Sequence, residues 1–327
     1  MYVVTGGAGF IGSALVWALN ERGITDIVIV DHNLDKREKG NNLLPLNYRE
    51  FINKDVFIQN IRNLNLDFSP EAIFHLGACS STTEDDMDFL RRNNVDYSLD
   101  LARYALERDI RFIYASSAAT YGDGSLGYSD DHELIPELQP LNKYGRSKQL
   151  VDEKAFEEGW LDEIVGLKYF NVYGPNEYHK GEMRSVQNKS FPQAREKGTI
   201  RLFKSHRNDY EHGQQERDFL YVKDAVDMTL FFLDNPETSG IFNIGVGNAR
   251  TFDDLAEAIF DALDKPTKIE YFAMPEEIRP NYQYHTEADL TEIRNAGYTE
   301  DLYSLEEGIK DYVQNYLLNN SAHLTPS

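Results

Sequence analysis

The stretch Val3–Leu19, "VVTGGAGFIGSALVWAL", decides the fold. It begins with apolar residues typical of a buried strand, continues through closely spaced glycines, and ends with helical periodicity. Gly6, Gly9 and Gly12 form a G-x-x-G-x-x-G series, and Gly7, Gly9 and Gly12 also satisfy G-x-G-x-x-G. Such glycines permit a tight turn and bring a pyrophosphate close to a helix N-terminus. The stretch predicts a strand, a phosphate-binding turn and a helix, with an ordinary glycine-rich turn as the weaker alternative.

A second signal for a dinucleotide is an acidic residue about twenty positions further on. Asp31 ends the next apolar run, where a carboxylate would bind a ribose 2′-hydroxyl and so favour NAD. Cationic residues near it could instead neutralise the 2′-phosphate of NADP, although their spacing alone favours a solvated loop. These residues are Lys36, Arg37, Lys39 and Lys54. The residues alone leave the choice between NAD and NADP open.

The first half of the chain alternates short apolar runs with amphipathic stretches, which predicts an α/β fold with a doubly wound parallel sheet. The expected strands are Tyr2–Val4, Ile27–Val30, Ala72–Leu76, Phe112–Ser116 and Ile164–Tyr169. The expected helices between them are Ile11–Arg22, Asp86–Arg108 and Lys143–Glu158.

The pattern becomes irregular after Phe170 and then returns to the sheet. Three segments indicate this return: a strand-like "FLYV", a helix over Lys223–Asp234, and "GIFNIG" at 240–245. We expect a Rossmann domain from 1–170 plus about 218–245, and a smaller α/β substrate-binding lobe from about 171–217 plus 246–300. A C-terminal helix and tail would occupy about 301–327.

Composition excludes several classes of partner. The formal net charge of -22 argues against nucleic acid or an anionic membrane as the main partner. No apolar run approaches the roughly 20 residues that span a bilayer, and no signal peptide is expected before the first strand. The one cysteine, Cys79, excludes an internal disulfide and fits the cytoplasm. No metal site is expected.

A serine, a tyrosine and a lysine form the candidate catalytic set. Ser116 and Ser117 end a predicted strand, at the sheet edge where ligands bind in open α/β folds. Tyr144 and Lys148 are one helical turn apart, so they lie on one face. The lysine and a positive nicotinamide would both lower the tyrosine pKa, and Ser117 could hold a substrate hydroxyl. Taken alone, the pair could be a packed tyrosine under a surface lysine, but its context favours catalysis.

Longer motifs resemble one family. The glycine turn, the serine strand and Y-x-x-x-K are similar to the extended short-chain dehydrogenase/reductases that act on nucleotide sugars. "GACSSTTE" (77–84), "RYALERDI" (103–110), "YASSAATYG" (114–122), "YFNVYGPNEYHKGEM" (169–183) and "RDFLYV" (217–222) resemble, within that class, the ADP-L-glycero-D-manno-heptose 6-epimerase family. The resemblance runs from Met1 to about Tyr312.

The resemblance implies transient oxidation and re-reduction at C6″ of an ADP-heptose, in the supply of lipopolysaccharide inner-core heptose. It places a second acid/base residue at Lys180, which by itself would be an exposed loop lysine. Ala118 and Ala119 follow Ser117, where a dehydratase of this class has an Asp-Glu pair, so elimination of water is not expected. The catalytic residues would be Tyr144, Lys180, Ser117 and Lys148.

The resemblance also implies the binding residues. It favours one NADP per subunit, tightly bound and not consumed, with Lys39 and Lys54 near the 2′-phosphate. The cofactor contacts would be Gly6, Gly9, Phe10, Ile11, Gly12, Asp31, His32, Lys39, Lys54, Leu76, Gly77, Ala78, Cys79, Ser80, Asn93, Lys148, Val172 and Lys180. The substrate contacts would be Asn171, Glu182, Lys189, Leu202, Phe203, Lys204, Arg217 and Tyr282. Arg217 could instead pair structurally with Asp218.

Other functions remain open at this point. The family suggests a homo-oligomer, commonly a pentamer. Alternatives are a UDP-hexose 4-epimerase, a net-reducing dehydrogenase, and a non-catalytic nucleotide-binding protein on the same fold. A non-catalytic binding protein would not need a catalytic set. The presence of Ser117, Tyr144, Lys148 and Lys180 therefore argues against that alternative.

Overall fold

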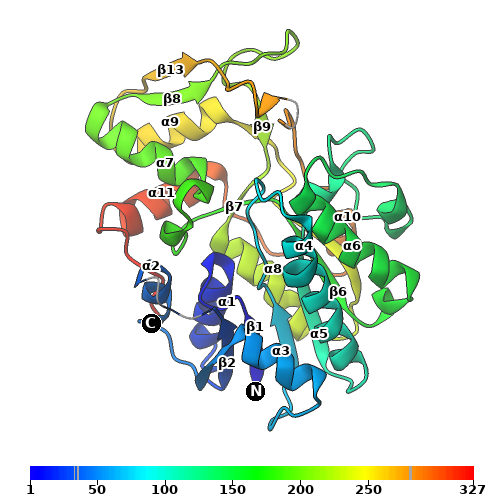
Figure 1. Ribbon diagram of the computed structural model, residues 1–327. Coiled ribbons are helices and arrows are strands. Elements are labelled where there is room, and N and C mark those ends of the chain that lie inside the picture. The colour runs from blue at the N-terminus through cyan, green and yellow to red at the C-terminus, as the bar shows by residue number, and fades with distance from the viewer. Residues whose placement is uncertain (33, 35–36, 280–281) are drawn as a thin grey trace.

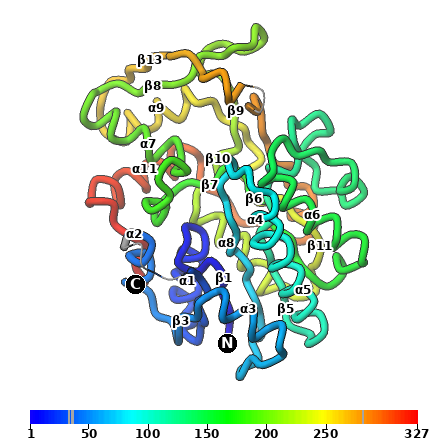
Figure 2. The backbone as a smooth tube through the Cα atoms, viewed as in Figure 1, coloured from blue at the N-terminus to red at the C-terminus, as the bar shows by residue number. Residues whose placement is uncertain are grey.

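A seven-stranded parallel sheet forms the centre of the computed structural model, in the order β11-β6-β5-β4-β1-β2-β3 (Figures 1 and 2). The structure describes residues 1–32, 34, 37–279 and 282–327. The strands are β1 (Tyr2–Thr5), β2 (Ile27–Asp31), β3 (Glu50–Asn53), β4 (Ala72–His75), β5 (Arg111–Ser117), β6 (Val165–Tyr169) and β11 (Gly240–Ile244). The predicted doubly wound α/β class is confirmed.

Helices cover both faces of this sheet because its strands alternate their side chains between two apolar layers. Val4 packs in the layer that includes α1 (Phe10–Glu21) and α8 (Val222–Asp234). Val3 packs in the opposite layer, with α3 (Lys54–Arg62), α5 (Tyr97–Leu106) and α6 (Lys143–Glu157).

The expected helix over Asp86–Arg108 is continuous but irregular. It consists of α4 (Met87–Leu90), a π-helical stretch (Arg91–Asp96) and α5. The wide turn contains Asn94, whose side-chain amide donates to the Cys79 carbonyl and the Ser147 hydroxyl. A π turn of this kind re-aims side chains, and such turns often occur beside functional sites.

Smaller elements lie beyond the carboxyl ends of the central strands (Figure 1). Three two-stranded sheets pair β7 (Asn171–Tyr173) with β10 (Phe219–Tyr221), β8 (Ile200–Phe203) with β13 (Ile269–Phe272), and β9 (Glu216–Arg217) with β12 (Arg250–Thr251). The remaining helices are α2 (Arg37–Gly40), α7 (Val186–Pro192), α9 (Phe252–Ala262), α10 (Thr291–Asn295) and α11 (Leu305–Asp311). Helix α10 lies against β11 of the central sheet, whereas α11 lies against α9.

The C-terminal tail returns to the first helix. Leu324 is fully buried, and the Trp17 indole of α1 donates to the Thr325 carbonyl (3.3 Å). Among the described residues, no helix is long and apolar enough to cross a membrane.

Candidate active site

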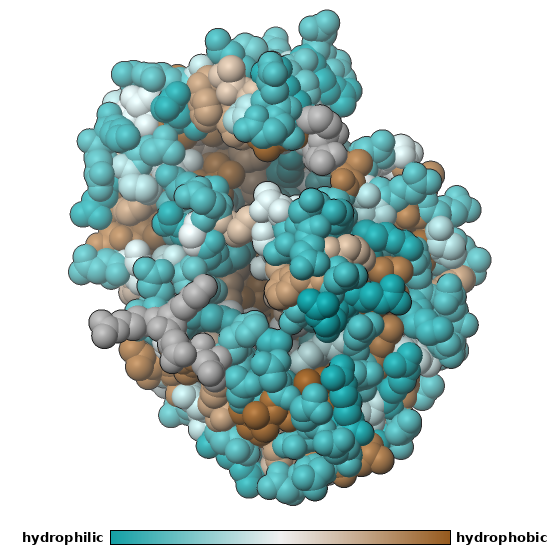
Figure 3. Space-filling model, viewed as in Figure 1, coloured by the Kyte–Doolittle hydropathy of each residue, from teal (hydrophilic) through white to brown (hydrophobic). Residues whose placement is uncertain are grey.

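A cleft of about 1170 Å³ opens at the carboxyl ends of the central strands, and the space-filling view shows this face of the molecule hollowed (Figure 3). Residues predicted from widely separated motifs meet there. Those that line it are Gly6, Gly9, Phe10, Ile11, Gly12, Asp31, His32, Lys39, Lys54, Leu76, Gly77, Ala78, Cys79, Ser80, Asn93, Ser117, Tyr144, Lys148, Asn171, Val172, Lys180 and Arg217.

The glycine turn at one end of the cleft fits a pyrophosphate. Gly6 has a φ of 67°, which favours glycine, and a Cβ atom at Gly12 would lie 2.2 Å from the Gly6 carbonyl oxygen. Gly9 caps α1 without a side-chain hydrogen bond, so the first-turn N–H groups face the cleft unblocked by a cap. An anionic group would therefore meet a helix N-terminus with its positive partial charge.

The carboxylate of Asp31, at the end of β2, is already engaged. It accepts from the Ala8 amide (3.0 Å) and from the Lys39 ammonium (2.5 Å). Lys54 donates to Asn93 (3.1 Å) and Asp55 (2.9 Å) beside the same end of the cleft. Both cations thus line the cleft, and their contact with a 2′-phosphate stays a prediction. Lys36 and the side chain of Arg37 fall outside the described residues.

Tight packing fixes the start of α6 against the serine turn. The Asn142 side chain caps the helix by accepting from the Gly145 amide (2.7 Å). A Cβ atom at Gly145 would lie 2.7 Å from the Ala119 carbonyl oxygen, so only glycine permits this approach. Tyr144, next to this contact, is thereby brought within hydrogen-bonding reach of Ser117.

Burial controls the protonation of this pair. It raises the pKa of the Tyr144 hydroxyl, although the hydrogen bond with Ser117 acts in the opposite direction. Burial also lowers the pKa of Lys148 to about 8, with Asp152 opposing the shift. The Lys148 ammonium donates to the Ala115 carbonyl (2.7 Å). Burial therefore acts against the lowering that we expected from Lys148 and a bound nicotinamide, and that expectation stays a prediction.

Lys180 reaches the same cleft from a different element, the 3₁₀ segment Tyr178–Met183. Its ammonium lies 5.2 Å from the centre of the Phe10 ring, and burial lowers its pKa against the opposing charge of Glu177. The buried Glu177 carboxylate anchors this segment by accepting from Ser185 and Tyr312. Lys180 is therefore a half-buried cation in the cleft and not the free loop lysine that its motif alone suggests.

The predicted substrate residues divide into two groups. Asn171 and Arg217 line the cleft, whereas Glu182, Lys189, Leu202, Phe203, Lys204 and Tyr282 do not, and their role stays a prediction. The Lys189 ammonium donates to the Glu182 carbonyl (2.9 Å).

Arg217 connects the cleft to this second group. Its guanidinium lies 5.1 Å from the centre of the Tyr282 ring, which in turn meets Phe203 edge to face. Within the described chain, Asp218 makes no ion pair with Arg217 and instead accepts from the amides of Val246, Gly247 and Ala288. The alternative that Arg217 pairs structurally with Asp218 is therefore wrong.

Sequence reasoning missed several residues of the cleft wall. Arg184, Ser185 and Gln187 follow the "EYHKGEM" motif directly, so this proximity was a usable signal. Gln283 and Thr286 come from a late, irregular segment that offers no comparable pattern. The other missed wall residues include Thr82, Phe89, Tyr97, Asn142, Phe219 and Phe252.

Comparison with known proteins shows the family of the chain. Residues 2–245 match the model of the NAD dependent epimerase/dehydratase family. The chain therefore belongs to the NAD dependent epimerase/dehydratase family.

More similar relatives narrow the assignment. The chain is 52% identical over 324 residues to an ADP-L-glycero-D-manno-heptose-6-epimerase of Nitratidesulfovibrio vulgaris, covering 99% of this chain and 100% of the relative. It is 48% identical to a protein of the same name from Fusobacterium nucleatum, over 99% of this chain and 100% of the relative. Within the larger family, the chain thus groups with the ADP-L-glycero-D-manno-heptose-6-epimerases.

Solved structures share the fold. The Helicobacter pylori ADP-L-glycero-D-manno-heptose-6-epimerase superposes with a TM-score of 0.80 at 30% identity, covering 96% of this chain and 95% of that one. A UDP-glucuronic acid 4-epimerase from Bacillus cereus, in complex with UDP-glucuronic acid and NAD, gives 0.76 at 25% identity, over 96% and 99% of the two chains.

Proposed function

We propose that the chain converts ADP-D-glycero-β-D-manno-heptose to ADP-L-glycero-β-D-manno-heptose, for lipopolysaccharide inner-core synthesis. One observation carries the proposal: Tyr144 and Lys180, two groups able to exchange protons, reach one cleft from different elements beside a phosphate-binding turn. The names of the full-length relatives support the choice of an ADP-heptose.

The protein's own residues would manage the protons of this reaction. When bound, a nicotinamide supplies a hydride acceptor for C6″ and then a hydride donor for the ketone. One of Tyr144 and Lys180 takes the C6″ hydroxyl proton, and Ser117 holds that oxygen through a hydrogen bond. After the exocyclic ketone turns about the C5″–C6″ bond, the other residue donates a proton to the same oxygen. The substrate loses and regains one hydride and one proton, and proton exchange with solvent returns Tyr144 and Lys180 to their starting states, so the net reaction is an isomerisation.

The cofactor in this proposal is NADP, one per subunit, tightly bound and not consumed. The ion pair between Lys39 and Asp31 supports it, because the cation offsets the carboxylate that would repel a 2′-phosphate. We expect nucleotide to remain with the purified protein and to be released as NADP by denaturation. Release of NAD alone would overturn this choice.

The reaction itself is tested with purified protein and ADP-D-glycero-β-D-manno-heptose, followed by NMR of the heptose and by absorbance of reduced nicotinamide. We expect the L-glycero epimer to accumulate with no net absorbance change. A parallel incubation with UDP-glucose serves as the control, because solved neighbours include UDP-sugar 4-epimerases. Epimerisation of UDP-glucose alone, or stoichiometric oxidation of added NADPH, would contradict the proposal.

The assembly and the location belong to the same proposal. We expect a cytoplasmic homo-oligomer, by family resemblance a pentamer. Light scattering after gel filtration gives the subunit number directly, and a monomer would contradict this part.

A further inference from the structure

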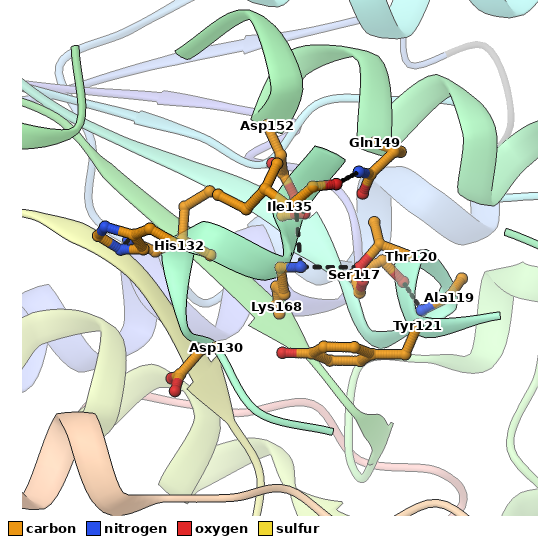
Figure 4. Close-up of polar contacts among 12 residues, drawn as sticks. Ser117, Ala119, Thr120, Tyr121, Asp130, His132, Ile135, Gln149, Asp152 and Lys168 are labelled. Atoms are coloured by element: carbon orange, nitrogen blue, oxygen red, sulfur yellow. Dashed lines mark hydrogen bonds and ion pairs between the residues drawn. The ribbon is translucent and has the colours of Figure 1, made fainter. Parts of the chain in front are cut away.

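A buried ion pair lies behind the serine strand, on the sheet face that α6 covers. Lys168 on β6 is the register partner of Ser116 on β5, so their side chains share that face. The Lys168 side chain is 1% exposed and that of Asp152 on α6 is 0% exposed, with 3.8 Å between ammonium and carboxylate (Figure 4). A charged pair at this depth is unusual in a parallel sheet and calls for an explanation.

The lysine end of the pair is connected to Ser117. The Lys168 ammonium donates to the Thr120 hydroxyl (3.1 Å), which donates to the Ser117 carbonyl (2.9 Å). The Ser117 hydroxyl accepts from the Ala119 amide within the same turn (3.1 Å). Figure 4 shows the ammonium between Asp152 and Thr120, above the Tyr121 ring. Lys168 thus stabilises the turn that aims Ser117 into the cleft.

The carboxylate end of the pair is connected to Lys148. Tyr144, Lys148 and Asp152 follow one another at four-residue intervals, so they lie along one face of α6. The Asp152 carboxylate also accepts from the Tyr114 hydroxyl (2.9 Å) and the Ser116 hydroxyl (2.6 Å) of β5. These bonds fix the helix face that carries Tyr144 and Lys148 to the strand that carries Ser117.

The other groups facing Lys148 leave Asp152 as its counter-charge. Cys79 approaches from the loop after β4, and Tyr144 lies one turn earlier on α6. His75 on β4 is buried between the Thr5 and Ser98 hydroxyls, and burial together with Lys148 lowers its pKa to about 3, so it stays neutral. Asp152 acts in the opposite direction, supporting the charged form of Lys148.

Stability alone does not account for the pair, because apolar residues of similar volume often replace a buried ion pair without loss. We propose that Asp152 and Lys168 are positioning residues: Lys168 fixes the turn that carries Ser117, and Asp152 fixes the helix face that carries Lys148 and places a counter-charge one turn away from it. The kinetic test of this inference rests on the proposed function. The NMR titration of Lys148 does not depend on it.

The sharpest test replaces the charge of Asp152 and keeps its shape, in Asp152→Asn. Loss of an opposite charge should lower the Lys148 pKa by about 1 unit, seen as an earlier titration of its Cε signal in NMR of ¹³C-lysine-labelled protein. The Lys148→Met protein assigns that signal. In epimerisation, the alkaline limb of the kcat profile should move to lower pH by the same amount. An inactive parent enzyme would refute the proposed function and leave the titration as the test of Asp152.

Asp224→Asn is the matched control, because Asp224 on α8 is also a buried carboxylate, bonded to the Tyr303 amide (3.0 Å) and outside the cleft wall. It should leave the titration and the kcat profile unchanged. A Lys148 titration that is the same in Asp152→Asn as in the parent would overturn the role of Asp152.

Lys168 provides a second test that does not depend on the folding of Asp152→Asn. Lys168→Met should lower kcat about 10-fold or more, the low end for a displaced catalytic group, while the substrate KM changes little. Lys168→Arg, which keeps the charge and the donors, should recover part of that loss. Equal kcat in the parent, the Met variant and the Arg variant would show that Lys168 is only structural.

Discussion

Burial governs the chemistry of single residues in this cleft more than neighbouring charge does. It raises the pKa of Tyr144 and lowers those of Lys148 and Lys180. A tyrosine that holds its proton and a lysine that releases its proton easily suit opposite halves of one proton exchange. We therefore expect Tyr144 and Lys180 to be separately indispensable.

Removing either group tests this expectation. Tyr144→Phe and Lys180→Met should each lower kcat for epimerisation at least about 10²-fold, since general acid/base help is worth that much or more. Both proteins should keep their nucleotide, because neither change alters the glycine turn. Lys197→Met, at an exposed lysine, is the control and should match the parent. Near-normal epimerisation by Lys180→Met would reduce the mechanism to a single base.

His75 gives the pH dependence of stability a definite sign. Its pKa falls from the usual 6.5 to about 3 in the folded protein, because it is buried and lies near Lys148. The unfolded chain then binds more protons below pH 6.5, so this stabilisation is complete above that pH and is lost as the pH falls toward 3. The slope from one such group is at most about 1.4 kcal/mol per pH unit.

Denaturant unfolding of the parent and of His75→Gln between pH 7 and pH 5 measures this effect. We expect the free energy of unfolding to fall less steeply with acid in the variant, which has no imidazole to protonate. The same slope in both proteins would assign the acid sensitivity to other groups.

The sequence revealed Tyr144 and Lys148 because both follow from local spacing on one helix. It did not reveal the partnership of Asp152 with Lys168, because that contact depends on the register of β5 beside β6, which local spacing does not define. For the same reason it could place Arg217 near a ligand only by resemblance.

At the level of whole elements, the sequence predicted long buried strands well and weak edge strands poorly. β5 and β6 have strong apolar runs and lie within a residue or two of their expected bounds. β3 (Glu50–Asn53) was not expected, because it lies at the sheet edge and is only partly buried. The partial burial of β3 comes from its contact with β2, and the local sequence pattern of β3 carries no sign of that contact.

The C-terminal tail acts on the segment that carries Lys180. The Tyr178 hydroxyl donates to the Ala322 carbonyl (2.8 Å), and the Leu324 amide donates to the Asn176 side chain (3.0 Å). Asn176 in turn donates to Ser13 on α1 (3.0 Å). The tail therefore joins the Lys180 segment to the cofactor-binding helix.

Truncation tests this connection. Removing residues 322–327 should lower the melting temperature and reduce kcat, because both hydrogen bonds and the buried Leu324 side chain are lost; core truncations of leucine cost about 2–5 kcal/mol. Removing only residues 326–327, which deletes the exposed contact of Ser327 with Glu21, is the control and should change neither. Full activity and stability in the longer truncation would show that the tail plays no part in the site.

Across the whole molecule, strands from the first part of the sequence pair with strands from the last part. β6 pairs with β11, β7 with β10 and β8 with β13, so each pair joins a strand before residue 205 to one after residue 213. The connecting loop around Arg207 and Asp209 is exposed. Its backbone can be interrupted without removing any of these strand pairs.

We expect polypeptides 1–208 and 209–327, produced together, to form a stable complex that epimerises at a substantial fraction of the parent rate. Gel filtration and the NMR assay measure both properties, and each fragment alone should be inactive. Fragments that fail to associate would show that the intact loop is needed for folding.

Such a division has a practical consequence. Neither fragment contains a whole site, because the glycine turn, Tyr144 and Lys180 belong to one and Arg217 to the other. If each fragment is fused to a different protein, the interleaved strands can pair only when those two proteins associate. Formation of the epimerised product would then report that association.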